Sequence, residues 1–254
     1  MSYTGQFLIA VVALVIVRVE GQLVDPRIAG GSDAPQGQYP FMVSLHYVNP
    51  VDNSSKHICG ATILSENWAL TAGGCIIGPN FLNDHFLYSG SVDLESGGRT
   101  HLPIQVEVHE DYFLGGFDIA VIKVDPPFDF TDPFKWAPVS LPQTGFEVQE
   151  GLPATVLGWG QETPNTSTVQ FLKAATISTI DDSNCSMLTD PANMICAGTS
   201  EGNIGHCYGD NGGPLIVDGV QLGIVSYSIA CESTLPSIFT QVSSYIDWIA
   251  THTV

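Results

Sequence analysis

The segment GHCYGDNGGP, Gly205–Pro214, has the composition of a chain segment that presents a reactive side chain. Glycines free the backbone to form a tight turn, and such a turn usually positions a neighbouring group. The segment contains one acid, Asp210, followed by Asn211. An amide is a poor nucleophile, so the residue that this turn presents does not match the apparent purpose of the turn.

The N-terminus and the cysteines indicate export. Phe7–Val17 is an apolar run of 11 residues, too short to span a bilayer, and it predicts a signal peptide over residues 1–21. Six cysteines without a metal-type CxxC pair predict up to three disulfides, and spacing alone leaves 15 pairings open. Sequons at Asn53, Asn165 and Asn184 could carry glycans if they are exposed.

The net charge excludes several kinds of partner. The 254 residues carry 26 Asp and Glu against 7 Lys and Arg, a formal charge of −19. Nucleic acids and anionic membranes would be repelled, whereas a basic protein partner would be attracted. Without residues 1–27, five basic residues (7 − 2) and 24 acids (26 − 2) remain. An endopeptidase that cuts after Lys or Arg therefore has few places to cut, which suits a protein that meets digestive enzymes.

The mature chain is predicted to consist mostly of short β-strands. Runs rich in β-branched residues alternate in polarity, and glycine and proline clusters separate them. Asp218-Gly219 predicts a hairpin turn, and Ser243–Thr253 has helical spacing with Ser243 or Ser244 as N-cap. This pattern favours an all-β barrel or sandwich. The predicted strands are Phe41–Val48, Gly60–Leu64, Ile104–Glu110, Ile119–Val124, Pro153–Gly160, Pro214–Ser228 and Pro236–Val242.

Seven short motifs occur in the order found in chymotrypsin- and trypsin-like serine proteases, and the chain resembles that family from Arg27 to Val254. They are RIAGG (Arg27–Gly31), NWALTAGGC (Asn67–Cys75), FDIAVIKV (Phe117–Val124), LGWG (Leu157–Gly160), GDNGGP (Gly209–Pro214), VSYS (Val225–Ser228) and DWI (Asp247–Ile249).

The resemblance implies an all-β fold of two antiparallel six-stranded β-barrels with a cleft between them and a C-terminal α-helix. The N-terminal barrel would take about 28–137 and the C-terminal barrel about 138–254, after a propeptide of residues 22–27. The implied disulfides are Cys59–Cys75, Cys185–Cys196 and Cys207–Cys231.

Two positions at the centre of the family's chemistry differ. Gly74 stands where the family has its catalytic histidine and Asn211 where it has its serine, whereas Asp118 matches the aspartate. A serine hydroxyl attacks a carbonyl only when a histidine takes its proton. With base and nucleophile both absent, we expect that the chain is not an enzyme. None of the remaining histidines is expected to replace the base: His46, His57, His85, His101, His109, His206 and His252.

The implied specificity pocket is altered as well. Gly205 occupies the floor position that holds an acid in trypsin-like enzymes, so the resemblance implies no preference for Lys or Arg. Ser228 and Ser237 stand where the family often has glycines, and their side chains should narrow or plug the pocket. A small elastase-like pocket is the alternative.

Other parts of the family's machinery are kept. Arg27-Ile28 resembles a zymogen cleavage site, and the freed amine of Ile28 would pair with Asp210. Such a buried ion pair is favourable only when both partners arrive together. The backbone N–H groups of Gly209 and Asn211 could still form an oxyanion hole. A purely structural need for Asp210 is an equally good explanation of its presence.

We therefore expect a secreted, extracellular serine protease homologue, a pseudoprotease, that acts by binding a protein. The partner would be a protease, an inhibitor or a substrate-like protein, and no cofactor, metal, nucleic acid or membrane is expected. Acting as a decoy for protease inhibitors is one form of this hypothesis. The alternative is a weakly active or non-standard serine-type endopeptidase.

Overall fold

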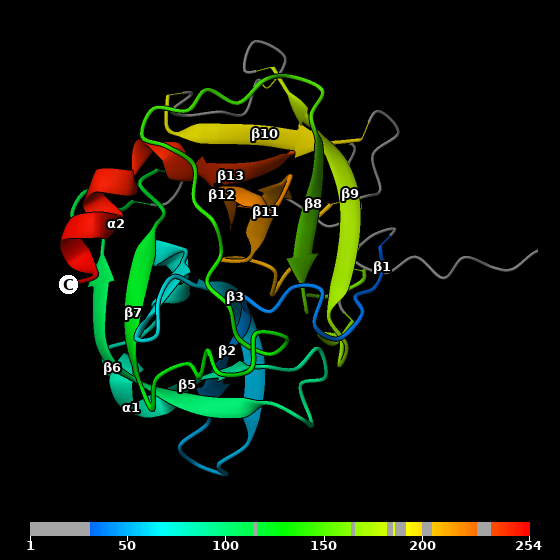
Figure 1. The fold of residues 1–254 in the computed structure, drawn as a ribbon. Helices are drawn as coiled ribbons and strands as arrows, with labels where there is room; N and C mark the ends of the chain where they lie inside the picture. The colour runs from blue at the N-terminus through cyan, green and yellow to red at the C-terminus, as the bar shows by residue number, and fades with distance from the viewer. Residues whose placement is uncertain are drawn as a thin grey trace, which may run out of the picture.

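The computed structural model describes residues 31–113, 116–163, 166–181, 185, 192–199, 205–227 and 235–254 (Figure 1). Several predicted features lie outside these residues: the signal peptide, the propeptide, Arg27, Ile28, Asn165, Asn184, Ser228 and Cys231. Asn53 lies inside them and is exposed in the turn between two strands. No helix in the described residues is long and apolar enough to cross a membrane.

The first half of the chain forms a closed antiparallel barrel in the order β2-β3-β4-β7-β6-β5. Its interior is filled by large apolar side chains such as Leu45, Leu70 and Ile122, all fully buried. The strands are β2 (Met42–Val48), β3 (Ser55–Ile63), β4 (Trp68–Thr71), β5 (His85–Ser89), β6 (Arg99–Val108) and β7 (Ala120–Asp125), with the short helices η1 (Gly73–Cys75) and α1 (Phe81–Asp84) between β4 and β5.

The second half forms a sheet in the order β1-β9-β10-β13-β12-β11-β8, and β9 also pairs with β8. That extra pairing closes six strands into a second antiparallel barrel, with β1 added at the edge of β9 (Figure 1). The strands are β1 (Ser32–Asp33), β8 (Pro153–Gly158), β9 (Lys173–Ile180), β10 (Met194–Gly198), β11 (Pro214–Val217), β12 (Val220–Tyr227) and β13 (Ser237–Gln241). The predicted fold of two six-stranded barrels is confirmed.

The C-terminal helix α2 (Ile246–His252) follows the 3-10 turn η3 (Val242–Ser244) and packs on the first barrel (Figure 1). Tyr245 and Ile249 belong to the same apolar cluster as the core of that barrel. The helix is shorter than the predicted range, and the predicted serine cap is wrong. Tyr245 is the N-cap without a side-chain capping bond, because Ser243 donates to Phe146 and Ser244 to Ala192.

Candidate functional site

The glycine-rich turn is fixed to both barrels by backbone hydrogen bonds. Gly60 N–H donates to the Asn211 carbonyl (2.7 Å) and Gly212 N–H to the Val225 carbonyl (2.8 Å). Gly212 has a φ of +79°, and an added Cβ would lie 2.2 Å from Thr71 Oγ1, so only glycine fits there. This close contact between the barrels explains why the turn needs its glycines.

Two N–H groups of this turn are not used by the fold. Gly209 has a φ of +98°, and neither its N–H nor that of Asn211 has an acceptor in the part of the chain that the structure describes. Paired free N–H groups bind a carbonyl oxygen or a developing oxyanion. The two residues of the proposed oxyanion hole, which flank Asp210 in the turn, thus both carry an unused N–H donor.

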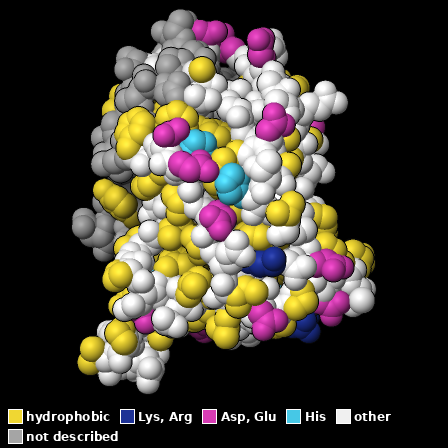
Figure 2. Space-filling model, turned by 90° about the vertical axis from the view of Figure 1, so that its left-hand side faces the viewer, with side chains coloured by type: hydrophobic (Ala, Val, Ile, Leu, Met, Phe, Trp, Pro, Cys, Tyr) yellow, Lys and Arg dark blue, Asp and Glu magenta, His cyan; other side chains and the backbone are white. Residues whose placement is uncertain are grey.

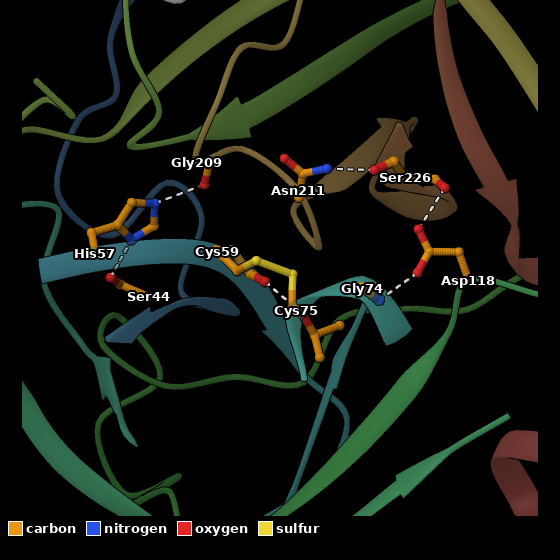
Figure 3. Close-up of a disulfide and its surroundings, with 11 residues drawn as sticks. Ser44, His57, Cys59, Gly74, Cys75, Asp118, Gly209, Asn211 and Ser226 are labelled. Atoms are coloured by element: carbon orange, nitrogen blue, oxygen red, sulfur yellow. Dashed lines mark hydrogen bonds between the residues drawn. A yellow bond between two sulfur atoms is a disulfide. The ribbon is translucent and has the colours of Figure 1, made fainter. Parts of the chain in front are cut away.

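A hydrogen-bond chain joins the three triad positions (Figure 3). The Asn211 side-chain amide donates to the Ser226 carbonyl, and Ser226 Oγ donates to Asp118 Oδ2 at 2.6 Å. Gly74 N–H donates to Asp118 Oδ1 at 2.7 Å. The pairing of β12 with β13 shifts register at residue 226, so Ser226 is not opposite a β13 residue and can serve this network. The sequence motifs include Ser226, but its link to Asp118 was not predicted.

Asp118 is 6 % exposed, and its burial raises the pKa of the carboxyl. The hydrogen bonds from Ser226, Gly74 and Gly73 act in the opposite direction, because they stabilise the carboxylate. Thr240 Oγ1 also donates to the Asp118 carbonyl at 2.9 Å. The aspartate is thus held rigidly from both barrels.

Position 74 is open to solvent beside Asp118. Gly74 is exposed, and a Cβ built on it would lie 3.6 Å from Asp118 Oδ1 and 3.1 Å from the Tyr112 hydroxyl. A side chain here would stand next to the buried carboxylate, as the resemblance implies for a histidine. Burial and the charge of Asp118 raise the pKa of Tyr112, so its phenol stays neutral and can donate a hydrogen bond. Tyr112 was not among the predicted site residues.

Asp210 is completely buried beneath the turn. Gly160 N–H donates to Oδ1 and Cys207 N–H to Oδ2, both at 2.8 Å. Burial nevertheless raises the pKa of Asp210 to about 7, because two N–H groups replace hydration only in part. A Cβ on Gly158 would lie 2.0 Å from Asp210 Oδ1, so this glycine in the LGWG motif makes room for the carboxylate.

A second polar chain reaches the turn from the first barrel. Ser44 Oγ and His57 Nδ1 are 2.7 Å apart, and His57 Nε2 lies 2.8 Å from the Gly209 carbonyl (Figure 3). The carbonyl only accepts, so Nε2 carries the proton and Nδ1 accepts from Ser44. Both side chains are buried. His57 is one of seven histidines in the sequence, and its pairing with Ser44 was not predicted, because Ser44 lies 13 residues away on another strand.

Acid should weaken the fold through His57. Burial, with a smaller effect of His46, lowers its pKa from the ordinary 6.5 to about 3. A lowered histidine pKa stabilises the protein above about pH 6.5, and this contribution is lost as the pH falls toward 3. The shift corresponds to a loss on the order of 4 kcal/mol. Urea unfolding of His57→Gln from pH 7 to 4 should show a flatter decline than the unmodified chain.

The half-buried His252 near the C-terminus offers the control. His252→Gln should leave the acid-dependent decline as it is. Equal declines in His57→Gln and the unmodified chain would contradict the assignment to His57.

The residues of the implied specificity pocket are only partly described. Gly205 is buried, and a Cβ on it would lie 2.9 Å from Ser237 Oγ, so the hydroxyl stands directly over the floor position. His206 is buried and its ring lies 5.8 Å from that of Phe239, in an edge-on arrangement. The structure thus brings Gly205 and Ser237 together and places His206 in the core of the second barrel.

The cysteines in the described residues are all disulfide-bonded. Cys59–Cys75 ties β3 to η1 and lies between the two polar chains in Figure 3, and Cys185–Cys196 lies in the second half. Cys207 is also disulfide-bonded, and its implied partner, Cys231, lies outside the described residues. The same residues contain no group of three or more His, Cys, Asp or Glu that could hold a metal ion.

Comparisons with known proteins agree on the family. The Trypsin family model matches residues 28–249. The chain is 34 % identical to Trypsin 5G1 of Aedes aegypti, over 88 % of this chain and 84 % of that protein. It is 35 % identical to Chymotrypsin-2 of Vespa crabro, over 87 % of this chain and 98 % of that protein. The solved human heparin binding protein has the same fold, with a TM-score of 0.77, 24 % identity and coverage of 88 % of this chain and 96 % of that one.

These findings correct the prediction that the chain is not an enzyme. That prediction used Gly74 and Asn211 alone. The structure contains a serine hydrogen-bonded to a histidine, Ser44 and His57, and a buried Asp118 bonded to a serine, which together form a triad-like set. The relatives are named as trypsins and a chymotrypsin. The prediction is therefore wrong: the two substitutions remove a base and a nucleophile at their own positions and do not exclude hydrolysis by the chain.

Proposed function

Since the chain belongs to the trypsin family, we propose that it is a secreted protein whose cleft binds a polypeptide segment of a protease, an inhibitor or a substrate-like protein. The apolar run Phe7–Val17 and the disulfides support secretion. The proposal follows from one observation: the glycine-rich turn keeps its backbone hydrogen bonds and its two unused N–H groups, while positions 74 and 211 are Gly and Asn.

Binding of a polypeptide depends more on the ordered backbone of the glycine-rich turn than on the side chains at positions 74 and 211. The turn keeps two unused N–H groups, and hydrogen bonds to β3 and β12 hold it in place. A site that is already ordered loses little entropy when a polypeptide docks. Asn211 is held by the Ser226 carbonyl, so the side chain at the nucleophile position is also fixed.

Filling the cleft tests the binding proposal. Gly74→Trp places a bulky side chain next to Asp118, and the Cβ itself fits if the Tyr112 hydroxyl moves by a few tenths of an ångström. Binding of a protein inhibitor of trypsin-class proteases, followed by calorimetry, should weaken by at least about tenfold, or 1.4 kcal/mol. Gln105→Trp, on the exposed face of β6, is the matched control and should bind like the unmodified chain. Equal loss in both variants, or no binding by the unmodified chain, would contradict the proposal.

A second candidate function, serine-type endopeptidase activity, is favoured by the Ser44–His57 hydrogen bond. A serine within hydrogen-bond reach of a neutral histidine is the arrangement of an activated nucleophile. Because both side chains are buried, a substrate would reach Ser44 only after β2 and β3 open locally.

A fluorophosphonate probe separates this candidate from the first. Endopeptidase activity through the pair predicts covalent labelling at Ser44, located by peptide mass spectrometry and absent from Ser44→Ala. Peptide turnover that survives in Ser44→Ala would show that the pair does not carry it.

A further inference from the structure

The seven Lys and Arg residues are distributed unevenly along the chain. Two of them, Arg18 and Arg27, lie in the first 30 residues, and the other five lie from residue 31 on. The segments after residue 30 that the structure does not describe contain neither Lys nor Arg. The structure therefore describes every basic residue of the folded body: Lys56, Arg99, Lys123, Lys135 and Lys173.

Four of these five residues lie within β-strands, where the peptide bond after each is paired with a neighbouring strand. Lys123 lies on β7 between Trp68 of β4 and Gln105 of β6, and Val124 N–H donates to the Asn67 carbonyl at 2.9 Å. The others are Lys56 on β3, opposite Tyr47, Arg99 on β6, opposite Ser89, and Lys173 on β9, between β1 and β8. An endopeptidase binds its substrate as an extended segment, so each strand would have to leave its barrel first.

The fifth residue, Lys135, lies in a turn that packs against the first barrel. The N–H groups of Lys135 and Trp136 both donate to the Asp132 carbonyl at 3.0 Å. Trp136 is 6 % exposed, and its indole N–H donates to Ser89 Oγ at 2.8 Å. Cleavage after Lys135 would require removal of a buried indole from the first barrel.

The side chains of four of the five basic residues are engaged as well, whereas Lys56 is exposed. The Arg99 guanidinium and the Lys135 ammonium lie over the Trp136 ring at 5.2 and 5.7 Å, and the Lys123 ammonium lies 5.1 Å from the Trp68 ring centre. Lys173 is 3 % exposed and pairs with Asp33. An endopeptidase that draws a basic side chain into its own pocket would have to break these contacts. Few Lys or Arg side chains appear on the face of the molecule that Figure 2 shows, among many apolar and acidic ones.

We propose that the folded body from residue 31 on resists endopeptidases that cut after Lys or Arg, so that the peptide bonds after all five of its basic residues stay intact while the chain is folded. The resistance would protect the protein from a Lys/Arg-specific serine endopeptidase in the same fluid. This inference does not depend on what the cleft binds.

Limited digestion of the full chain by trypsin tests the proposal. Mass spectrometry should show an intact body from residue 31 on, while the urea-unfolded chain should be cut after all five basic residues of that body. An internal fragment released from the folded chain, confirmed as folded by circular dichroism, would overturn the proposal.

Two variants that each add one lysine test whether the resistance comes from the positions of the basic residues or only from their small number. Pro50→Lys adds a lysine in the exposed turn between β2 and β3, whereas Ile104→Lys adds one on β6, where the side chain is 53 % exposed. The Pro50→Lys body should be cut at least about a hundredfold faster than the unmodified body, and Ile104→Lys should stay intact. An uncut Pro50→Lys, or equally fast cutting of both variants, would overturn the proposal.

Discussion

The double variant Gly74→His/Asn211→Ser should hydrolyse peptide substrates at least about a thousandfold faster than the natural chain. The geometry for this gain is present. A Cβ at position 74 lies 3.6 Å from Asp118 Oδ1, so the carboxylate could orient an imidazole there. Ser226 and Thr240 already hold Asp118 in place. A serine at position 211 would have its own N–H and that of Gly209 available to stabilise the oxyanion. Initial rates with a panel of chromogenic peptides measure the effect.

The single variants provide the first control, because a nucleophile and its base act as a unit. Gly74→His alone and Asn211→Ser alone should each gain far less than the pair. Adding Asp118→Asn to the double variant should remove most of the gain, since the carboxylate no longer supports the imidazolium. A double variant that is no faster than the natural chain would mean that the frame of the cleft is not competent for this chemistry.

Cleavage after Arg27 should remove the loss of stability that Asp210 causes as the pH rises. In the single chain its pKa is raised by burial from the ordinary 3.8 to about 7. A raised carboxyl pKa gives stability that is fully present below about pH 3.8 and lost as the pH rises through about 7. The shift corresponds to on the order of 4 kcal/mol. An ammonium group brought beside Asp210 would favour the carboxylate and remove this loss.

Urea unfolding at pH values from 4 to 8 measures the effect. The free energy of unfolding of uncut Asp210→Asn should lack the loss toward neutral pH that the uncut natural chain shows. Arg27→Gln, which cannot be cut, should keep that loss after treatment with trypsin. Identical pH dependence of the cut and uncut natural chains would show that Asp210 does not receive the new amine.

The barrel strands could be predicted from the sequence where apolar and polar residues alternate along them. The run before Val48 alternates and became β2, and Asp218-Gly219 forms the predicted hairpin turn, with φ values of +49° and +81°. The fully buried strands β4 and β10 were not predicted, because they have no polar face and therefore no alternation of polarity. β9 alternates in burial, but its first inward-facing residue is Lys173, whose charge conceals the pattern.

The site residues also fall into those that the sequence predicts and those that it does not. Short motifs located Asp118, Asp210 and the substituted positions, because each lies within a contiguous segment with fixed spacing. The pair of Ser44 and His57 could not be found in this manner. It depends on the register of β2 against β3, in which a shift between Leu45 and His46 decides which side chains share a face. Buried polar pairs that arise from register leave no local signature.

The burial of Lys173 has an electrostatic consequence at long range. It is the only Lys or Arg from residue 138 to the C-terminus, a stretch that contains 11 acids, whereas Lys56, Arg99, Lys123 and Lys135 all lie in the first half. The second barrel therefore exposes no Lys or Arg. The net charges of the two halves are nearly equal all the same: residues 28–137 carry 13 acids and four basic residues, a net −9 (4 − 13), and residues 138–254 carry 11 acids and one, a net −10 (1 − 11). A positively charged wall or macromolecule should attract both barrels, and added salt should screen this attraction beyond a Debye length of roughly 10 Å.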